Sequence, residues 1–136
     1  AVPPVPDAGP GCEGSPVRGL WYGTFTGQVY SELTGQVSVT GTMELQIYCE
    51  ETLLVHGTME GSEQSGVPFE AEVDGEYDED QDVMRASWEG TVYVVPASGQ
   101  LQGVFSDVPL ERIAGSWQGT APEVQGTGDG QWTVGR

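Results

Sequence analysis

The side chains best suited to nucleophilic or acid–base chemistry are few in this sequence. His56 is the single histidine, no serine stands in a Gly-x-Ser-x-Gly setting, and neither Cys12 nor Cys49 has a base beside it in the sequence. The alternation of apolar residues predicts that the ring of His56 faces outward, beside Leu54 and Thr58. One histidine and two cysteines also make no zinc ligand set. The sequence therefore predicts a protein that is not an enzyme.

Carboxylates are abundant, and four of them share one face of a predicted strand. Alternate positions along a strand lie about 7 Å apart and point to the same side. The four are Glu70, Glu72, Asp74 and Glu76, here called the acidic ladder, and Glu60 and Glu89 extend it on neighbouring strands. Glycan hydrolysis needs two carboxyl groups that flank a cleft, and an outward row on a convex surface offers none. We therefore interpret the acidic ladder as a solvated face and as a candidate surface for a basic partner.

The turn after this strand carries three aspartates at alternate positions. They are Asp78, Asp80 and Asp82. Their spacing resembles the start of an oxygen-rich calcium loop, although the glycine and the distal glutamate of an EF-hand are missing. An acidic turn is also common on solvated surfaces. Calcium binding at these three residues is a hypothesis, and the sequence predicts no other cofactor.

The formal net charge of −17 over 136 residues limits the partners of this protein. A surface of this sign repels phosphate groups, which argues against nucleic acids and anionic membranes. It favours a divalent cation, or a protein or cell-surface partner with basic groups. No apolar run has the length of a membrane-spanning helix, and the sequence leaves a homo-oligomer open.

Residues 1–16 are rich in proline and glycine and predict an extended tether ahead of the folded domain, residues 17–136. The chain begins with alanine, and this composition is typical of the spacer after a cleavage site in an exported protein. We therefore expect an extracytoplasmic protein, either secreted, periplasmic or surface-anchored. In such a compartment Cys12 and Cys49 predict a disulfide. The bond would close a loop of roughly 37 residues and stabilise the fold by about 3–4 kcal/mol.

The folded domain is predicted to consist of β-strands, because apolar residues alternate with polar ones almost throughout. The clearest stretch is QVSVTGTMELQIYC, residues 36–49, where apolar side chains and one glycine occupy every odd position. The same alternation predicts strands over residues 19–30, 36–49, 52–61, 67–77, 83–95, 100–106, 113–121 and 131–135. Short polar or glycine-rich connections predict hairpins between them, including residues 96–99 and 126–130.

A glycine recurs two positions after an apolar residue on the inward face of seven successive predicted strands. The pairs are Trp21/Gly23, Val39/Gly41, Val55/Gly57, Val73/Gly75, Trp88/Gly90, Leu101/Gly103 and Trp117/Gly119. An inward glycine lets a strand bend, as a closed barrel requires, and leaves room for a large neighbouring side chain. We therefore predict an all-β fold, an antiparallel up-and-down meander barrel of about eight strands, with a two-sheet β-sandwich as the alternative.

The predicted barrel interior is aromatic, which raises the question of a ligand. Six inward side chains are candidate ligand contacts: Trp21, Phe25, Trp88, Phe105, Trp117 and Trp132. Such an interior could hold a small apolar molecule. The inward positions include very few polar groups to orient a ligand, so we favour a barrel filled by its own side chains.

Two short motifs resemble those of calycin-type barrels, the group that contains lipocalins and avidins. Gly19-Leu20-Trp21 is similar to the Gly-x-Trp at the start of their first strand. The segments Trp117-Gln118-Gly119-Thr120 and Gly128-Asp129-Gly130-Gln131-Trp132-Thr133 are similar in layout to the last hairpin of avidin-like proteins. The resemblance implies an eight-stranded up-and-down barrel. It does not imply biotin binding, because avidins use polar groups that include asparagine, this chain has none, and we expect Asp129 in a turn.

These observations favour a non-enzymatic, exported binding or structural module, displayed on a cell surface or in the periplasm. The alternative is a carrier of a small apolar ligand inside the barrel. A glycan-acting hydrolase that uses the acidic ladder ranks third. The first two differ in whether the barrel contains a cavity or is filled by its tryptophans.

Overall fold

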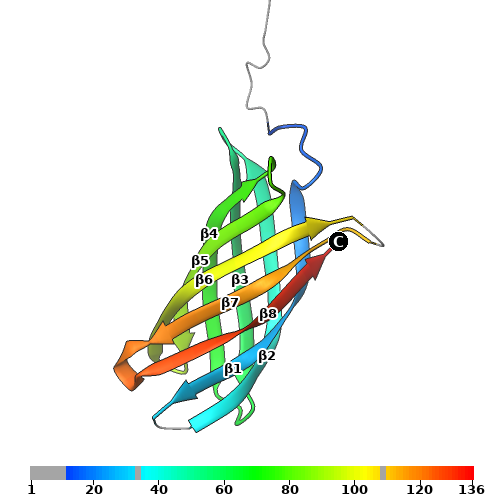
Figure 1. Ribbon diagram of the computed structural model, residues 1–136. Coiled ribbons are helices and arrows are strands. Elements are labelled where there is room, and N and C mark those ends of the chain that lie inside the picture. Colours follow the sequence, from blue (N-terminus) through cyan, green and yellow to red (C-terminus); the bar gives the residue numbers. More distant parts are fainter. Residues whose placement is uncertain (1–11, 33–34, 108–109) are drawn as a thin grey trace, which may run out of the picture.

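The computed structural model describes residues 12–32, 35–107 and 110–136. They form eight β-strands and one short 3₁₀ helix, η1 (Figure 1). The bounds are β1 Gly19–Ser31, β2 Gly35–Cys49, β3 Leu53–Glu63, β4 Pro68–Asp78, β5 Val83–Val92, β6 Val95–Ser106, β7 Arg112–Ala121, η1 Pro122–Val124 and β8 Gly126–Gly135. Within these residues, no helix has both the length and the apolar character needed to span a membrane.

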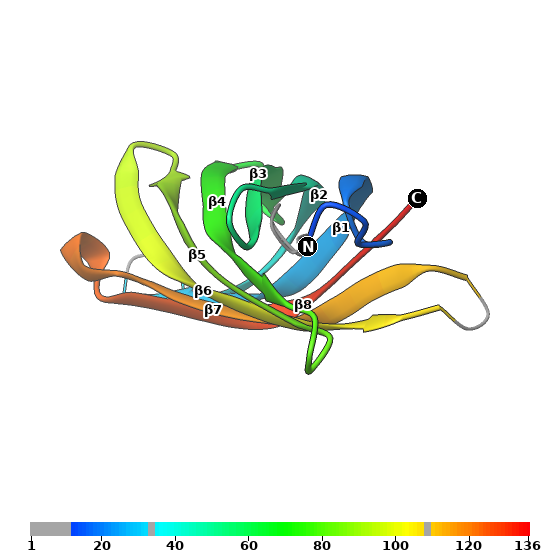
Figure 2. The same cartoon turned by 90° about the horizontal axis from the view of Figure 1, so that it is seen from above.

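The sheet closes on itself, which confirms the predicted barrel over the sandwich. Each strand pairs antiparallel with the next along the chain, and β1 pairs with both β2 and β8. The closing register runs from Tyr22 opposite Gly135 to Tyr30 opposite Thr127. Figures 1 and 2 show the long, tilted strands of this meander. Every strand is therefore hydrogen-bonded on both sides, and no sheet edge is left open.

Side chains alternate between the core and solvent along every strand, as period-2 geometry requires. In β2, for example, Met43, Leu45 and Ile47 are buried and the residues between them are exposed. The seven predicted glycines all lie on the inward side, next to buried partners. The core is therefore the barrel interior.

Several inward glycines make room for tryptophan rings from neighbouring strands. A Cβ at Gly119 would lie 2.2 Å from Cζ2 of Trp88, and a Cβ at Gly27 would lie 2.4 Å from Cζ2 of Trp117. Both distances are far below a normal carbon–carbon contact of about 3.5–4.0 Å. The glycine repeat thus fixes where the indole rings lie.

The predicted boundary between the fifth and sixth strands is wrong. The chain turns at Tyr93 and Val94, and Pro96 to Gly99 belong to β6 instead of a hairpin. Val94 lies within the predicted strand of residues 83–95 but is 72% exposed in the turn. Tyr93 adopts a left-handed backbone with φ of 61° in a turn that contains no glycine, so no residue typical of a turn marks the position.

The predicted hairpin at residues 126–130 is also wrong, because these residues are the first half of β8. The chain turns earlier, through η1, where Gln125 has a φ of 51°. Gly128 and Gly130 lie on the inward face against Trp117, and this packing explains a run of glycines that resembles a turn. Asp129 consequently lies on the outer face of β8, opposite Gln28 and Gln118, and not in a turn.

One end of the barrel is closed by residues 12–18, which the predicted disulfide holds in place. Cys12 and Cys49 are bonded, with their Cα atoms 5.6 Å apart. Val17 is buried, and its carbonyl accepts a hydrogen bond of 2.9 Å from Nε1 of Trp21. The guanidinium of Arg136 lies 4.2 Å from the centre of the Trp21 ring. Residues 12–16 of the expected tether thus lie at this end, with Cys12 buried, and residues 1–11 lie outside the described residues.

Candidate functional site

The opposite end of the barrel contains a cavity of about 200 Å³. It lies where the connections β1–β2, β3–β4, β5–β6 and β7–β8 meet, away from the disulfide. Its wall is mainly aliphatic and glycine, including Val29, Val92, Val95, Ala97 and Ala121. We call this space the mouth cavity. A 150 Å³ apolar cavity in another protein is large enough to bind benzene. The barrel is therefore filled by its tryptophans only in part, contrary to the packed interior that we favoured.

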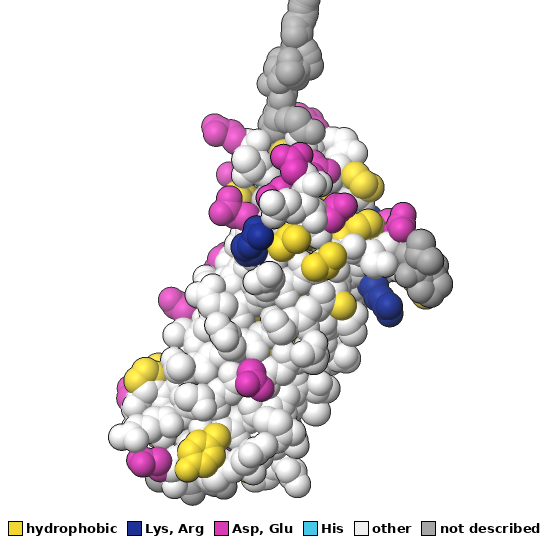
Figure 3. All heavy atoms as spheres, in the orientation of Figure 1, with side chains coloured by type: hydrophobic (Ala, Val, Ile, Leu, Met, Phe, Trp, Pro, Cys, Tyr) yellow, Lys and Arg dark blue, Asp and Glu magenta, His cyan; other side chains and the backbone are white. Residues whose placement is uncertain are grey.

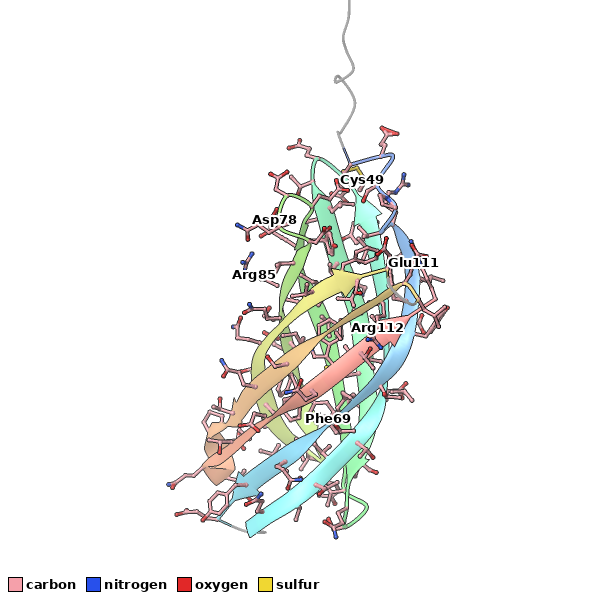
Figure 4. All side chains as sticks on the ribbon, turned by 45° about the vertical axis from the view of Figure 1, so that its right-hand side comes forward. Cys49, Phe69, Asp78, Arg85, Glu111 and Arg112 are labelled. Carbon is pink, nitrogen blue, oxygen red and sulfur yellow. A yellow bond between two sulfur atoms is a disulfide. The ribbon has the colours of Figure 1, made fainter. Side chains whose placement is uncertain are left out.

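Aromatic rings form the inner boundary of the mouth cavity. Phe69, Trp88 and Trp117 all line it, with ring centres 5.4 Å apart for Phe69 and Trp88 and 6.3 Å apart for the two tryptophans. The interplanar angles of 63° and 77° are edge-to-face arrangements, which suit the aromatic quadrupole. Figure 4 shows Phe69 within the barrel, well away from Cys49. This geometry gives the cavity a rigid apolar floor.

The indole N–H groups of Trp88 and Trp117 both donate hydrogen bonds to backbone carbonyl groups. Nε1 of Trp88 donates to the carbonyl of Gln118 at 3.1 Å, and Nε1 of Trp117 donates to the carbonyl of Thr26 at 2.9 Å. These bonds satisfy polar groups that would otherwise be costly to bury. The two tryptophans therefore present ring carbons to an occupant and offer it no free donor.

One charged side chain, Glu63, lines the mouth cavity. It is 8% exposed, and its Oε1 atom is buried without a hydrogen-bond partner among the described residues. Burial raises the pKa of its carboxyl above the ordinary value of 4.5. Glu63 was not among the predicted site residues, because the third strand was predicted to end at Gly61. Continuing the alternation by two positions places Glu63 on the inward face, where an acid is exceptional.

Two of the six predicted ligand contacts, Trp88 and Trp117, line the mouth cavity. Phe25 lies deeper in the core, 5.6 Å from Phe69 between ring centres. Trp21 packs at the closed end, 6.1 Å from the ring of Phe105. Trp132 is buried, and its Nε1 donates to the carbonyl of Ser116 at 3.0 Å. These last four residues support the fold and lie outside the cavity wall.

The acidic ladder lies on the outer face of β4, as predicted. All four of its side chains are exposed. In the register, Glu70 lies opposite Glu60 and Glu72 lies opposite Glu89. Asp74 has a closer partner, since its Oδ1 lies 2.9 Å from Nδ1 of the exposed His56. The ladder is thus a row of negative charge on a convex surface.

The outer surface is not uniformly acidic. The face shown in Figure 3 carries few charged side chains across its middle. Outward glutamines of the last three strands give it an uncharged polar surface: Gln100, Gln102, Gln118 and Gln131. The paired acidic side chains of the ladder and its neighbours lie instead on the side formed by β3, β4 and β5.

Two aspartates of the β4–β5 turn accept hydrogen bonds from groups in or beside the turn. Oδ1 of Asp78 accepts hydrogen bonds from the backbone N–H groups of Asp80 and Gln81. Oδ1 of Asp82 accepts one from the hydroxyl of Tyr77 at 3.1 Å. In the described part of the chain, no group of three or more His, Cys, Asp or Glu residues is arranged to hold a metal. Calcium binding at this turn stays a prediction.

Comparison with known proteins gives support at the level of the fold. No family model and no curated protein matches the chain. The solved structure of EF1p2_mFAP2b bound to DFHBI matches it with a TM-score of 0.56 and 14% sequence identity, over 88% of this chain and 93% of that one. A redesigned β-barrel, mFAP1, bound to DFHBI, matches with a TM-score of 0.50 and 14% identity, over 88% and 94%. Both neighbours are eight-stranded antiparallel up-and-down barrels, in agreement with the calycin-type architecture.

Proposed function

We propose that this protein binds a small apolar ligand in the mouth cavity. The observation that carries the proposal is an open cavity at one end of the barrel, with aliphatic walls and a floor of Trp88 and Trp117. Ligand sites in proteins are typically concave and mainly apolar, with few polar groups. The two structural neighbours are barrels solved with a bound small molecule, and this supports the same use of the fold here.

The size of the cavity limits the ligand to about one aromatic ring with a short substituent. The volume of about 200 Å³ lies below the roughly 300–1,000 Å³ of sites for drug-sized ligands. Its rim carries Tyr30 and Tyr93, which are 51% and 68% exposed. Tyrosines can contact a ligand through a ring face and a hydroxyl.

Binding, and not catalysis, fits the groups that line the cavity. Acid–base chemistry usually needs two titratable groups tuned in opposite directions. Among the described lining residues, Glu63 is accompanied by no histidine, lysine, cysteine or second carboxyl. Glu63 alone has no base or acid partner, so we infer a carrier or binding protein.

We also propose that the protein works outside the cytoplasm. The disulfide between Cys12 and Cys49 supports this location, because such bonds persist in oxidising compartments. The acidic ladder then remains available for a basic protein or cell-surface partner, as a function separate from the mouth cavity.

The proposed function is tested by filling the cavity. Phenethyl alcohol and ethylbenzene are titrated into the protein, and binding is followed by calorimetry and tryptophan fluorescence. Val95→Phe places a larger side chain in the lining, and Val94→Phe makes the same change at an exposed neighbour outside it. We expect Val95→Phe to weaken binding at least about tenfold and Val94→Phe to leave it within about twofold. Equal binding by both variants, or no binding to the unaltered protein, would overturn the proposal.

A further inference from the structure

Glu63 is an acid in a place where the fold supplies no counter-charge. Its side chain is more than nine-tenths buried, it lines the mouth cavity, and its Oε1 has no hydrogen-bond partner among the described residues. A buried carboxylate is costly unless it is paired with a cation or hydrogen-bonded. The position thus requires either a proton on the carboxyl or a partner from outside the chain.

The basic side chains of this protein are all too far away to be that partner. The chain has four Lys and Arg residues in total, and all four are arginines. Arg18 and Arg136 lie at the closed end, where the guanidinium of Arg136 donates to the carbonyl of Arg18. Arg85 and Arg112 stand near the starts of β5 and β7, whereas the cavity is lined by the ends of these strands (Figure 4). A cation at Glu63 has to arrive with the ligand.

We propose that the ligand of the mouth cavity is a small apolar amine, whose ammonium group pairs with Glu63 while its apolar body lies against Trp88 and Trp117. This inference rests on the proposed function and specifies the ligand class. An ammonium group has three donors and forms strong, charge-assisted hydrogen bonds with a carboxylate.

The charge of the whole protein supports the same ligand class. A net charge of −17 raises the local concentration of cations and lowers that of anions around the barrel. An acidic ligand would be repelled at long range and would also meet Glu63 in the cavity. A neutral ligand would leave the carboxylate without a counter-charge.

The test compares three molecules of nearly equal shape: phenethylamine, phenethyl alcohol and ethylbenzene. Each is titrated by calorimetry into the unaltered protein, into Glu63→Gln and into Glu60→Gln. The Glu60 variant loses the same charge from an exposed outward position on the same strand. It therefore reports any amine that binds the acidic outer face instead of the cavity.

We expect phenethylamine to bind the unaltered protein at least about tenfold more tightly than phenethyl alcohol, because hydrogen bonds to charged groups are the stronger ones. Glu63→Gln should reduce the affinity for the amine about tenfold or more, with the affinity for the alcohol within about threefold. Glu60→Gln should leave both affinities within about twofold. Unchanged binding of the alcohol also shows that the Glu63 variant is folded with its cavity intact.

The outcomes separate this inference from the function on which it rests. If the alcohol and ethylbenzene bind as well as the amine and Glu63→Gln changes nothing, the cavity is a binding site but the amine specificity is refuted. If Glu60→Gln weakens the amine as much as Glu63→Gln does, the amine binds the outer surface and the inference fails. If none of the three molecules binds, the proposed function itself fails.

Discussion

The glycine at position 119 offers the sharpest test of how this barrel is packed. In Gly119→Ala the new Cβ would lie 2.2 Å from Cζ2 of Trp88 and 2.8 Å from the carbonyl oxygen of Ser98. A normal carbon–carbon contact is about 3.5–4.0 Å, so the ring has to move by more than 1 Å. Gly126→Ala is the matched control, because its Cβ would meet its nearest atoms at 3.4 Å.

The Trp88 ring has little freedom to make that movement. It packs edge-to-face against Phe69 and Trp117 and donates to the carbonyl of Gln118 at 3.1 Å. Overpacking a core costs about 1–3 kcal/mol, and a buried N–H that loses its acceptor costs about 1–3 kcal/mol more. We therefore expect Gly119→Ala to lower the free energy of unfolding by about 2–6 kcal/mol, and Gly126→Ala to change it by less than about 1 kcal/mol.

The measurement is urea unfolding followed by far-UV circular dichroism, with the slope m required to stay constant. A double-mutant cycle with Trp88→Phe identifies the clash as the cause, because phenylalanine lacks the overlapping ring atom. In the Trp88→Phe background the penalty of Gly119→Ala should fall by at least about 1 kcal/mol. An equal penalty in both backgrounds would refute the packing argument, and so would an equal cost for Gly119→Ala and Gly126→Ala.

Three further predictions follow from the disulfide, from Glu63 and from the β4–β5 turn. Replacing Cys12 and Cys49 by alanine should lower the free energy of unfolding, measured in urea, by about 3–4 kcal/mol. A loss below about 1 kcal/mol would contradict the loop-closure argument. Burial raises the pKa of the Glu63 carboxyl, so the folded protein binds the carboxyl proton more tightly than the unfolded chain does. The protonated carboxyl therefore stabilises the fold at low pH, and this stabilisation is lost as pH rises from about 4.5 through the higher folded pKa. Over that pH range the free energy of unfolding of Glu63→Gln should therefore rise relative to that of the unaltered protein, by up to about 1.4 kcal/mol per pH unit. If the free energies of unfolding of the two proteins change in parallel with pH, the carboxyl is not desolvated. Calorimetric titration of Ca²⁺ into the unaltered protein should give heat that is lost when Asp78, Asp80 and Asp82 are replaced by asparagine. Equal heats from the two proteins would remove the calcium hypothesis.

The fold could be predicted from the sequence because two signals agree along most of the chain. Period-2 alternation identifies the strands, and the inward glycines indicate that the sheet bends closed. Both strand-boundary errors came from local turn signals that the packing overrides. Pro96 and the glycines of residues 126–130 suggested turns, but Gly128 and Gly130 are needed to accommodate Trp117.

The site was harder to predict, because it depends on how completely the interior is filled. Alternation assigns Trp88 and Trp117 to the interior, and both line the mouth cavity. It gives no information on the space that remains beside them, since that space depends on strand tilt and ring orientation. Glu63 could have been found, because it stands at an inward position of an alternating run. The apparent end of the strand at Gly61 hid it.

The closed end of the barrel also determines how the protein can be attached to something else. Cys12 is fixed there by the disulfide, and Arg136 is held there through its contact with Trp21, so both ends of the described chain leave from the side away from the mouth cavity. A fusion partner, an affinity tag or a solid support joined after Arg136 would leave the cavity open to solvent. A bulky label at the exposed rim residue Tyr93 would hinder entry instead. The barrel is therefore suited to surface immobilisation through its C-terminus, with the mouth cavity left open.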